Sequence, residues 1–191
     1  FRYGEPSLEK GLDFLIKQGC ARILLFNLYP QYSSSTSASN YDAVFSHLLK
    51  YRVIPALKVA EPFFESPYYI QAVATSITEN IDKLSAAPER IILSYHGIPL
   101  KLAETGDPYP DHCLATTEAI RQALPAHADK IIHAYQSRFG KANWIGPDVV
   151  GIVEDLHRQG IRRIAVTCPG FVADCLETLH EIDGELKNHF H

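Results

Sequence analysis

The stretch that decides the fold is Arg90-Ile91-Ile92-Leu93-Ser94-Tyr95-His96-Gly97-Ile98-Pro99. Its β-forming residues run as far as His96, and the Gly-x-Pro that follows can continue neither a strand nor a helix. The sequence therefore predicts a strand that carries His96 at its carboxyl end. Ligands bind at this edge of open α/β sheets, because the loops that leave the strands form a crevice there. His96 is thus a candidate functional residue, and a structural role for a strand-end histidine is the alternative.

Strands and helices alternate on both sides of this stretch. A continuous apolar run of strand length lies at 22–28 and has the pattern of a strand covered on both faces, and further strands are predicted at 130–135 and 161–167. Apolar residues at helical spacing predict helices over 7–18, 40–49, 67–85, 111–123 and 148–160 and a last helix from Asp174. Short connections between alternating strands and helices indicate an α/β fold with doubly wound parallel sheets.

Two segments before residue 67 lack a regular pattern. Pro55, Pro62 and Pro67 break up short apolar groups, and we expect a boundary between two domains here, with residues 1–54 before it and 55–191 after it. Residues 33–39, Ser-Ser-Ser-Thr-Ser-Ala-Ser, are too polar to pack, so we expect a solvated loop. Binding of an anion by its hydroxyl and backbone N–H groups is the alternative.

Composition and charge argue against several functional classes. The 191 residues are 46% hydrophobic and carry a net charge of -4, which is a globular composition without a basic field to attract nucleic acid. No apolar stretch is long enough to span a membrane, and no secretory signal is visible. The four cysteines form no Cys-x-x-Cys pair. This favours a reducing compartment over a disulfide scaffold or a structural zinc site, and we expect a cytoplasmic protein.

Polar and aromatic residues follow the other predicted strands. Gln136-Ser137-Arg138 and the segment 171–177 should face the same crevice as His96, because the strand ends of a parallel sheet line up along one edge. Arg138 offers a guanidinium suited to a carboxylate, and Trp144 and Phe171 offer flat surface, with core packing as the alternative for both aromatic residues. A flat, partly acidic ligand would fit these groups.

The last predicted helix places Asp174, Glu177, Glu181 and Glu185 along one face. Like charges at this spacing cost roughly 0.2–0.5 kcal/mol for each pair, and a divalent cation would remove that penalty. A capping box at Asp174 and Glu177 and a solvated acidic face for the other two are the alternatives. Imidazole plus carboxylates form a ligand set for Fe²⁺, Co²⁺ or Zn²⁺, and the same groups serve proton transfer.

Several motifs, in one order, resemble those of the ferrochelatase family in its bacterial form. They are Ser94-Tyr-His-Gly-Ile-Pro99, Gly106-Asp-Pro-Tyr109, Tyr135-Gln-Ser-Arg-Phe-Gly140 with Trp144, and Pro169-Gly-Phe-Val-Ala-Asp-Cys-Leu-Glu-Thr-Leu179. Arg2-Tyr3-Gly4 and Leu28-Tyr-Pro-Gln-Tyr32 extend the likeness from end to end. The chain begins at Phe1 and contains no methionine. By resemblance it lacks the first third of a full ferrochelatase and the C-terminal tail, so we expect a fragment, which alone could be inactive.

The resemblance implies a fold of two Rossmann-like domains with a porphyrin cleft between them. Residues 1–54 would be the C-terminal part of the first, incomplete domain, and residues 55–191 the second domain, which carries the catalytic histidine and the acidic helix. The implied activity is insertion of Fe²⁺ into protoporphyrin IX to form protoheme, in heme biosynthesis. The ring must be distorted and lose two pyrrole protons before the metal enters, so the protein must supply strain and a base.

The resemblance also implies roles for individual residues. His96 and Glu177 match the family's catalytic histidine and its partner carboxylate, and His96, Glu177, Glu181 and Glu185 would form the path of the metal or of protons. Whether His96 accepts the pyrrole protons or delivers the metal stays open. Positions of the porphyrin pocket are matched by Arg2, Tyr3, Tyr29, Gln136, Ser137, Arg138, Trp144 and Phe171.

Three other functions remain open at this point. A ferrochelatase of coproporphyrin III would differ only at the propionate edge of its substrate, and a cobalt chelatase of related fold would differ in its metal. A porphyrin- or metal-binding protein without catalysis would keep His96 and the acidic face as ligands. Some family members hold an iron–sulfur cluster through a cysteine of the Ser-rich loop, where this chain has Ser34, so we expect no cluster.

Overall fold

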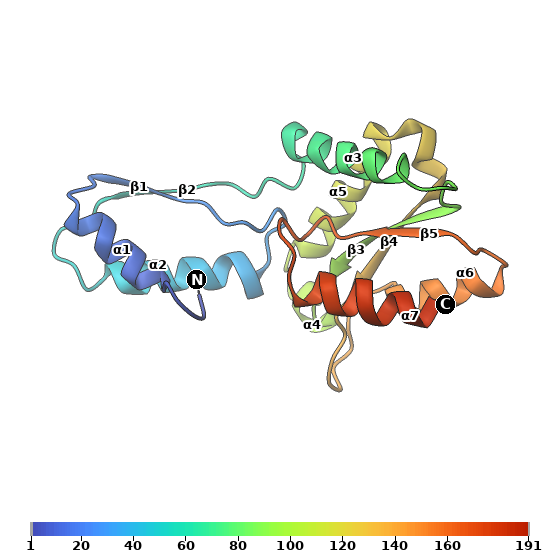
Figure 1. The fold of residues 1–191 in the computed structure, drawn as a ribbon. Coiled ribbons are helices and arrows are strands. Elements are labelled where there is room, and N and C mark those ends of the chain that lie inside the picture. Colours follow the sequence, from blue (N-terminus) through green and yellow to red (C-terminus); the bar gives the residue numbers. More distant parts are fainter. Residues whose placement is uncertain (1, 191) are drawn as a thin grey trace. The chain divides into compact units, whose positions relative to one another are not determined.

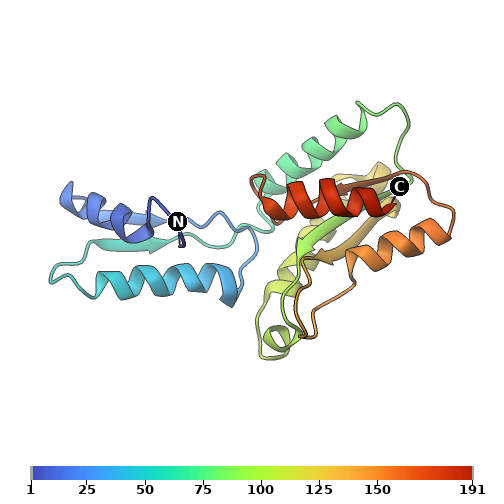
Figure 2. The same ribbon diagram turned by 60° about the horizontal axis from the view of Figure 1, so that its bottom comes forward.

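The computed structural model describes residues 2–190 of the chain (Figures 1 and 2). These residues form two compact units that divide between Pro62 and Phe63. Both units combine parallel strands with helices, which confirms the predicted α/β class with parallel sheets. The division follows Pro62 rather than residue 54, because Ala56–Val59 forms a strand that pairs within the first unit. Within residues 2–190, no helix is both long enough and apolar enough to cross a membrane.

The first unit is built on two parallel strands, β1 (Arg22–Leu25) and β2 (Ala56–Val59). Helices α1 (Leu8–Lys17) and α2 (Ser39–Leu48) pack against them through a small core of buried side chains, Leu12, Ile23, Val44 and Leu48. Helix α1 begins after Ser7, whose hydroxyl accepts a hydrogen bond from the Lys10 N–H, within one residue of the predicted start. Strand β2 lies in the segment whose prolines predicted irregular structure.

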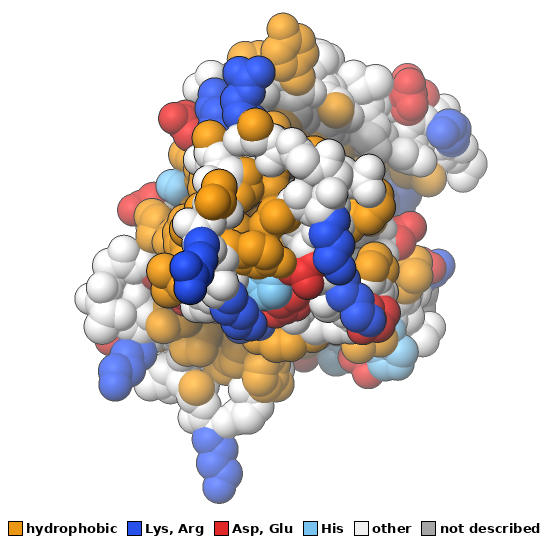
Figure 3. Space-filling model, turned by 90° about the vertical axis from the view of Figure 1, so that its left-hand side faces the viewer, with side chains coloured by type: hydrophobic (Ala, Val, Ile, Leu, Met, Phe, Trp, Pro, Cys, Tyr) orange, Lys and Arg blue, Asp and Glu red, His pale blue; other side chains and the backbone are white. Residues whose placement is uncertain are grey.

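One face of these two strands stays uncovered. Ile23 is buried, but the side chain of the next residue, Leu24, points the other way and is 60% exposed. The apolar run at 22–28 had predicted cover on both faces, and in the structure β1 already ends at Leu25. Figure 3 shows apolar side chains gathered on a surface that Lys and Arg side chains border. Exposed apolar residues of the first unit are Tyr3, Phe14, Leu24, Phe26, Leu28, Tyr29, Phe45, Leu49, Val53 and Ile54.

The Ser-rich residues, expected to form a solvated loop, are helical instead. Ser33 caps the π-helical turn η1 (Ser34–Ala38) by accepting a hydrogen bond of 3.2 Å from the Ser35 N–H, and η1 runs directly into α2. Ser33 and Ser37 are each 1% exposed. The polar run can pack because its hydroxyl groups bond within the turn. Asn40 therefore lies inside a helix rather than at its start.

The second unit contains a three-stranded parallel sheet in the order β4 (Ile131–Gln136), β3 (Arg90–His96), β5 (Ile164–Thr167). Its helices cover both faces of the sheet, as Figure 1 shows. They are α3 (Pro67–Ile81), α4 (Leu100–Glu104), α5 (Tyr109–Ala123), η2 (Pro125–Lys130), α6 (Val149–Arg158), η3 (Glu177–Leu186) and α7 (Lys187–Phe190). This three-layer arrangement is the doubly wound form that the sequence predicts.

Side chains of the central strand β3 alternate between the two layers of helices. Ile91, Leu93 and Tyr95 belong to the core under α3 and α5, whereas Ile92 belongs to the core under α6 and η3. Because successive side chains of a strand point to opposite faces, His96 shares the face of Ile92. The strand thus turns His96 toward the layer that holds η3.

Boundaries differ from the prediction by a few residues at several elements. Helix α5 begins at Tyr109 rather than at Asp111, because the carboxylate of Asp107 accepts a hydrogen bond of 3.0 Å from the Tyr109 N–H. Asp148 caps α6 as predicted, with its carboxylate 3.2 Å from the Gly151 N–H. Helix α3 ends at Ile81 instead of 85, and β5 begins at Ile164 instead of 161.

The helix that carries the acidic residues is the largest departure from the prediction. It begins at Glu177, and residues Glu177–Leu186 form a π-helix, in which each N–H bonds to the carbonyl five residues earlier. Asp174 lies before the helix, and its carboxylate accepts a hydrogen bond of 3.2 Å from the Thr178 hydroxyl. The sequence argument assumed α-helical spacing, and π-helices are rare and cluster at functional sites.

Candidate active site at the carboxyl end of β3

His96 ends β3 with a half-buried side chain. Its Nδ1 lies 2.6 Å from the carbonyl oxygen of Gly97. A carbonyl oxygen can only accept a hydrogen bond, so Nδ1 carries the proton and the lone pair of the neutral ring sits on Nε2. No residue of 2–190 forms a hydrogen bond with Nε2. The imidazole is therefore held in one tautomer with its basic nitrogen available.

Glu177, the first residue of η3, lies close enough to His96 for a charge on the imidazole to lower the pKa of the Glu177 carboxyl group. The Cys175 thiol and the Glu177 backbone N–H donate hydrogen bonds to the carboxylate, and together with the charge of His96 they hold the pKa of Glu177 below its ordinary value against partial burial. Burial raises the pKa of the Cys175 thiol, so this donor keeps its proton. Glu177 is consequently an ionised carboxylate beside an imidazole.

Glu181 is held from the end of β4. Its Oε2 accepts hydrogen bonds of 2.9 Å from Gln136 Nε2 and 2.5 Å from the Ser137 hydroxyl. Gln136 Nε2 also donates to the backbone carbonyl of Glu177 at 2.8 Å. The structure thus brings together the ends of β3 and β4 and the start of η3, as expected for neighbouring strand ends of a parallel sheet.

Glu185 stands apart from this group. Its carboxylate is exposed and lies 3.7 Å from Nδ1 of His180 on the same helix. Among residues 2–190, no three His, Cys, Asp or Glu side chains gather closely enough to hold a metal ion. Glu177 and Glu181 are thus half-buried and Glu185 is exposed, and these carboxylates do not form a closed metal cage.

Arg138 and Trp144 belong to the loop that joins β4 to α6. Arg138 Nε lies 3.5 Å from Asp148 Oδ1, and its Nη2 donates to the Ile145 carbonyl at 3.2 Å, while 41% of its side chain stays exposed. Trp144 Nε1 donates to the Phe139 carbonyl at 3.0 Å, and the two rings lie 4.8 Å apart. The guanidinium is oriented by protein groups but keeps N–H groups that face solvent.

Phe171, in the loop before η3, has its ring centre 6.4 Å from that of His96. Three other predicted pocket residues belong to the first unit. Arg2 donates a hydrogen bond of 3.3 Å to the Ser39 hydroxyl and lies over the ring of Tyr3, which is 82% exposed. Tyr29 is also exposed. All three present side chains that a ligand could contact.

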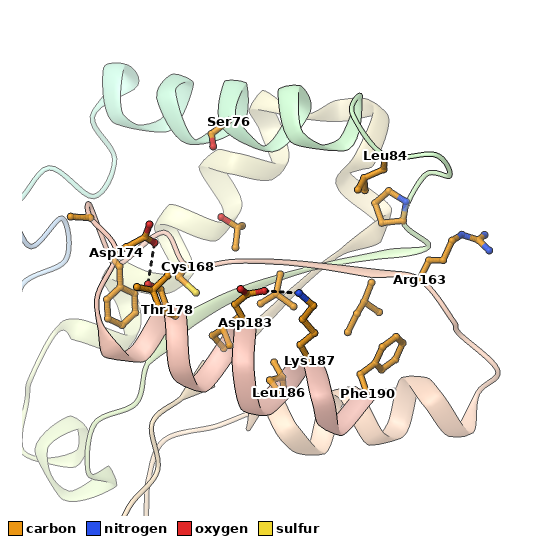
Figure 4. A pocket seen from close by; sticks show the side chains of 18 of the residues that line it. Ser76, Leu84, Arg163, Cys168, Asp174, Thr178, Asp183, Leu186, Lys187 and Phe190 are labelled. Atoms are coloured by element: carbon orange, nitrogen blue, oxygen red, sulfur yellow. Dashed lines mark hydrogen bonds and ion pairs between the residues drawn. The ribbon is translucent and has the colours of Figure 1, made fainter.

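A large cavity lined by described residues lies away from His96, which is not among its lining residues. It measures about 920 Å³ and lies between α3, β5 and η3 (Figure 4). Asp183 and Lys187, which form an ion pair of 2.9 Å, line it together with Cys168 and Phe171, whereas Glu177 and Glu181 do not. Phe171 thus borders both this cavity and the surroundings of His96.

Sequence reasoning missed two residues that shape the site. Ser94 donates a hydrogen bond of 2.8 Å to Gln136 Oε1, and the Cys175 thiol bonds to the Glu177 carboxylate. Ser94 lies two residues before His96. Because alternate residues of a strand share a face, the sequence alone could have placed Ser94 on the same face as His96. Cys175 has no predicted role, and no pattern of the sequence indicates its hydrogen bond.

Comparison with known proteins identifies relatives along the whole chain. A sequence model of the ferrochelatase family matches residues 1–191. Curated ferrochelatases of Bradyrhizobium diazoefficiens and Rhizobium meliloti are 50% identical over 184 residues and 45% identical over 190 residues, which is 96% and 100% of this chain. The matched parts are 53% and 56% of those proteins, so the chain spans about half the length of the curated relatives it matches.

One solved structure shares the fold. "SirB from Bacillus subtilis with Fe3+" superimposes with a TM-score of 0.64 over 97% of this chain and 68% of that chain. At 16% sequence identity, this likeness shows the fold alone.

Proposed function

The chain belongs to the ferrochelatase family, and on that premise we propose that the protein containing it inserts Fe²⁺ into protoporphyrin IX to form protoheme. The observation that carries the proposal is the imidazole of His96, whose Nδ1 proton is bonded to the Gly97 carbonyl and whose Nε2 is available beside the ionised carboxylate of Glu177. A base and a partner anion are what removal of pyrrole protons requires.

His96 acts first on the porphyrin. Nε2 accepts a pyrrole proton, and the negative charge of Glu177 stabilises the imidazolium that forms. The hydrogen bond from Nδ1 to the Gly97 carbonyl keeps the ring in place while Nε2 changes its protonation state. His96 passes this proton toward the carboxylates of η3, of which Glu185 is exposed, and then accepts and passes on the second pyrrole proton in the same way.

Fe²⁺ enters as a substrate and is not stored. Glu177, Glu181 and Glu185 offer oxygen ligands one after another, and no three metal-binding side chains of the described residues gather into a cage that would retain the ion. A row of single carboxylates suits transfer, because a metal that must leave cannot be bound too tightly at any one step. Once Nε2 of His96 has passed on its proton, it is unprotonated again and can act as the last ligand of the metal before the porphyrin.

Three of the predicted pocket residues, Arg138, Trp144 and Phe171, bind and distort the porphyrin in this proposal. Arg138 has N–H groups directed to solvent that can pair with a propionate, and Trp144 and Phe171 offer flat surface to the ring. Arg2, Tyr3 and Tyr29 remain predicted contacts of the porphyrin. We further propose a cytoplasmic protein without an iron–sulfur cluster and without nucleic-acid partners.

The test is anaerobic incubation of the protein with Fe²⁺ and protoporphyrin IX, followed by the loss of free-porphyrin fluorescence. The wild type and a Glu154→Ala control, which alters an exposed carboxylate of α6, should form protoheme, and Glu177→Ala should form it at least about 10-fold more slowly. A parallel assay with coproporphyrin III decides between the two porphyrins. If the wild type binds porphyrin but forms no metalloporphyrin above the protein-free rate, the protein is a binding protein and the proposal is wrong.

A further inference from the structure

Gln136 is predicted to contact the porphyrin, but its side chain is 2% exposed and every hydrogen bond it can form is already made. Nε2 donates to the Glu177 carbonyl and to Glu181 Oε2, at 2.8 Å and 2.9 Å. Oε1 accepts from the Ser94 hydroxyl at 2.8 Å and from the Cys168 thiol at 3.4 Å. An amide group has two donor hydrogens and two acceptor lone pairs, so none is left for a ligand.

The orientation of this amide follows from its partners. The Glu177 carbonyl can only accept a hydrogen bond, so it must face the NH₂ group and not the oxygen. The Ser94 hydroxyl then faces Oε1 as a donor. Four segments therefore meet at one buried side chain: β3 through Ser94, the end of β5 through Cys168, β4 itself, and η3 through two of its residues.

The backbone of Gln136 is bonded to the segment that carries His96. Gln136 is the register partner of His96, and its carbonyl accepts a hydrogen bond of 2.8 Å from the Gly97 N–H. A Cβ atom at position 97 would lie 2.9 Å from that oxygen, closer than real contacts allow, so the approach requires glycine. One residue thus fixes the end of the His96 strand with its backbone and the start of the Glu177 helix with its side chain.

The next residue reinforces the connection through an unusual backbone. In a regular strand the side chains of Gln136 and Ser137 would point to opposite faces. Ser137 has φ 65°, a left-handed conformation uncommon for a residue with a side chain, and its hydroxyl reaches the same Oε2 of Glu181 as Gln136 Nε2 does. Such strained residues persist where the surrounding structure fixes them, often at functional sites.

We propose that Gln136 is a positioning residue, which locks the π-helix η3 to the sheet and so sets the place of Glu177 relative to His96, and that it does not bind the porphyrin. The inference rests on the proposed function only for its catalytic consequence. A π-helix has less favourable geometry than an α-helix and needs external support. The two hydrogen bonds from Gln136 Nε2 supply that support in its first turn.

The test compares two variants of Gln136 with a matched control. Gln136→Leu keeps the volume but removes all four hydrogen bonds. In Gln136→Glu the introduced carboxyl group faces the carboxylate of Glu181. The two carboxyl groups share one proton until the pH is high, and this proton keeps a hydrogen bond between the two side chains. Thr117→Val is the control, since Thr117 is equally buried but bonds to Tyr95 and His133 under the other layer of helices.

Two readouts follow for each variant. Amide hydrogen exchange in residues 181–186 should be at least about 10-fold faster in Gln136→Leu and unchanged in Thr117→Val. In the insertion assay, kcat should fall roughly 10- to 100-fold in Gln136→Leu while the KM for porphyrin stays constant, as for other partners that orient a reacting group. Gln136→Glu should approach wild-type kcat at low pH and fall to the level of Gln136→Leu as the pH rises.

A rise in KM at constant kcat would make Gln136 a substrate contact and overturn the inference. Unchanged hydrogen exchange in η3 would overturn it as well, because the helix would then be independent of the amide. If the wild type inserts no metal, the proposed function is wrong, and the exchange data alone decide whether Gln136 positions η3.

Discussion

Each of the two units contains a histidine beside a carboxylate, and the two pairs differ in what their hydrogen bonds leave open. In the first unit, His47 Nε2 lies 2.5 Å from Asp13 Oδ1, and the Tyr51 hydroxyl donates to the same oxygen. His47 is 8% exposed, and its Nδ1 is buried without a partner among the described residues. In the second unit, His96 is half-buried and keeps Nε2 without a bond, while Glu177 is bonded by other donors.

The difference separates a pair that holds a fold together from a pair that can react. Oδ1 of Asp13 accepts hydrogen bonds from both His47 and Tyr51 and so joins α1 to the end of α2, while the remaining nitrogen of His47, Nδ1, is buried away from solvent. His96 is oriented by the carbonyl of Gly97, and Glu177 is oriented by the thiol of Cys175. The imidazole and the carboxylate are therefore not bonded to each other, and His96 Nε2 can accept a proton without losing a hydrogen bond. Whether a histidine near a carboxylate is structural or reactive can therefore be judged only when the other hydrogen bonds of both groups are known.

The largest expected effect is on the reaction and comes from His96. His96→Ala should lower the rate of Fe²⁺ insertion by about 10²- to 10⁴-fold, the usual contribution of a general base, because no other described group supplies an available imidazole beside Glu177. The melting temperature should stay unchanged. Stopped-flow porphyrin fluorescence measures the rate, with His189→Ala, an exposed histidine paired to Glu154, as the matched control. Equal rates in the two variants would remove His96 from the mechanism.

The opposite pattern should follow from His47. His47→Ala leaves Asp13 with one hydrogen bond fewer and a hole between α1 and α2, so the free energy of unfolding should fall by roughly 1–3 kcal/mol. Insertion activity should persist at temperatures below the new transition. Urea unfolding followed by circular dichroism checks the stability. A loss of activity in the folded variant as complete as in His96→Ala would erase the distinction between the two pairs.

A smaller effect sharpens the description of the open pair. Cys175→Ala removes the main hydrogen bond that lowers the pKa of Glu177, so this pKa should rise. Since Glu177 is needed as an anion, the acidic limb of the pH–rate profile should move to higher pH, with the rate at the optimum largely kept. Cys20→Ala, in the first unit, serves as the control. An acidic limb that does not move would show that the thiol does not set the ionisation of Glu177.

The smallest effect concerns the closed pair. The hydrogen bonds from Tyr51 and His47 hold the pKa of Asp13 below its ordinary value, so Asp13 stabilises the fold above the unfolded pKa of about 3.9, and this contribution is lost as the pH falls through the lower folded value. Tyr51→Phe should therefore destabilise the protein at neutral pH and less so in acid. Unfolding measured at several pH values tests this. A difference from wild type that stays constant into acid would contradict it.

Much of this arrangement is readable from the sequence, because it follows from strand period and apolar pattern. The residues before His96 predict a strand that ends at His96, as β3 does, and the alternation of strands and helices predicts the parallel sheets of both units. The convergence of His96, Gln136 and the segment before Glu177 follows from the strand ends alone. These features depend on backbone periodicity, which a single sequence expresses directly.

The rest depends on contacts that periodicity does not express. The π-helix at Glu177–Leu186 is supported by side chains of β4, and its acidic residues fit α-helical spacing equally well on paper. The Ser-rich turn packs because Ser33 caps it, although its composition is that of a solvated loop. Strand β2 is hidden among prolines and becomes visible only through its pairing with β1.

The most direct test of the difference between the two histidines is their reaction with diethyl pyrocarbonate, which modifies accessible unprotonated imidazole nitrogens. Peptide mapping by mass spectrometry during inactivation follows each histidine separately. We predict that insertion activity disappears in step with modification of His96, that bound porphyrin slows both, and that His47 stays unmodified in the folded protein. Modification of His47 at the same rate as His96, or loss of activity before His96 reacts, would contradict the account.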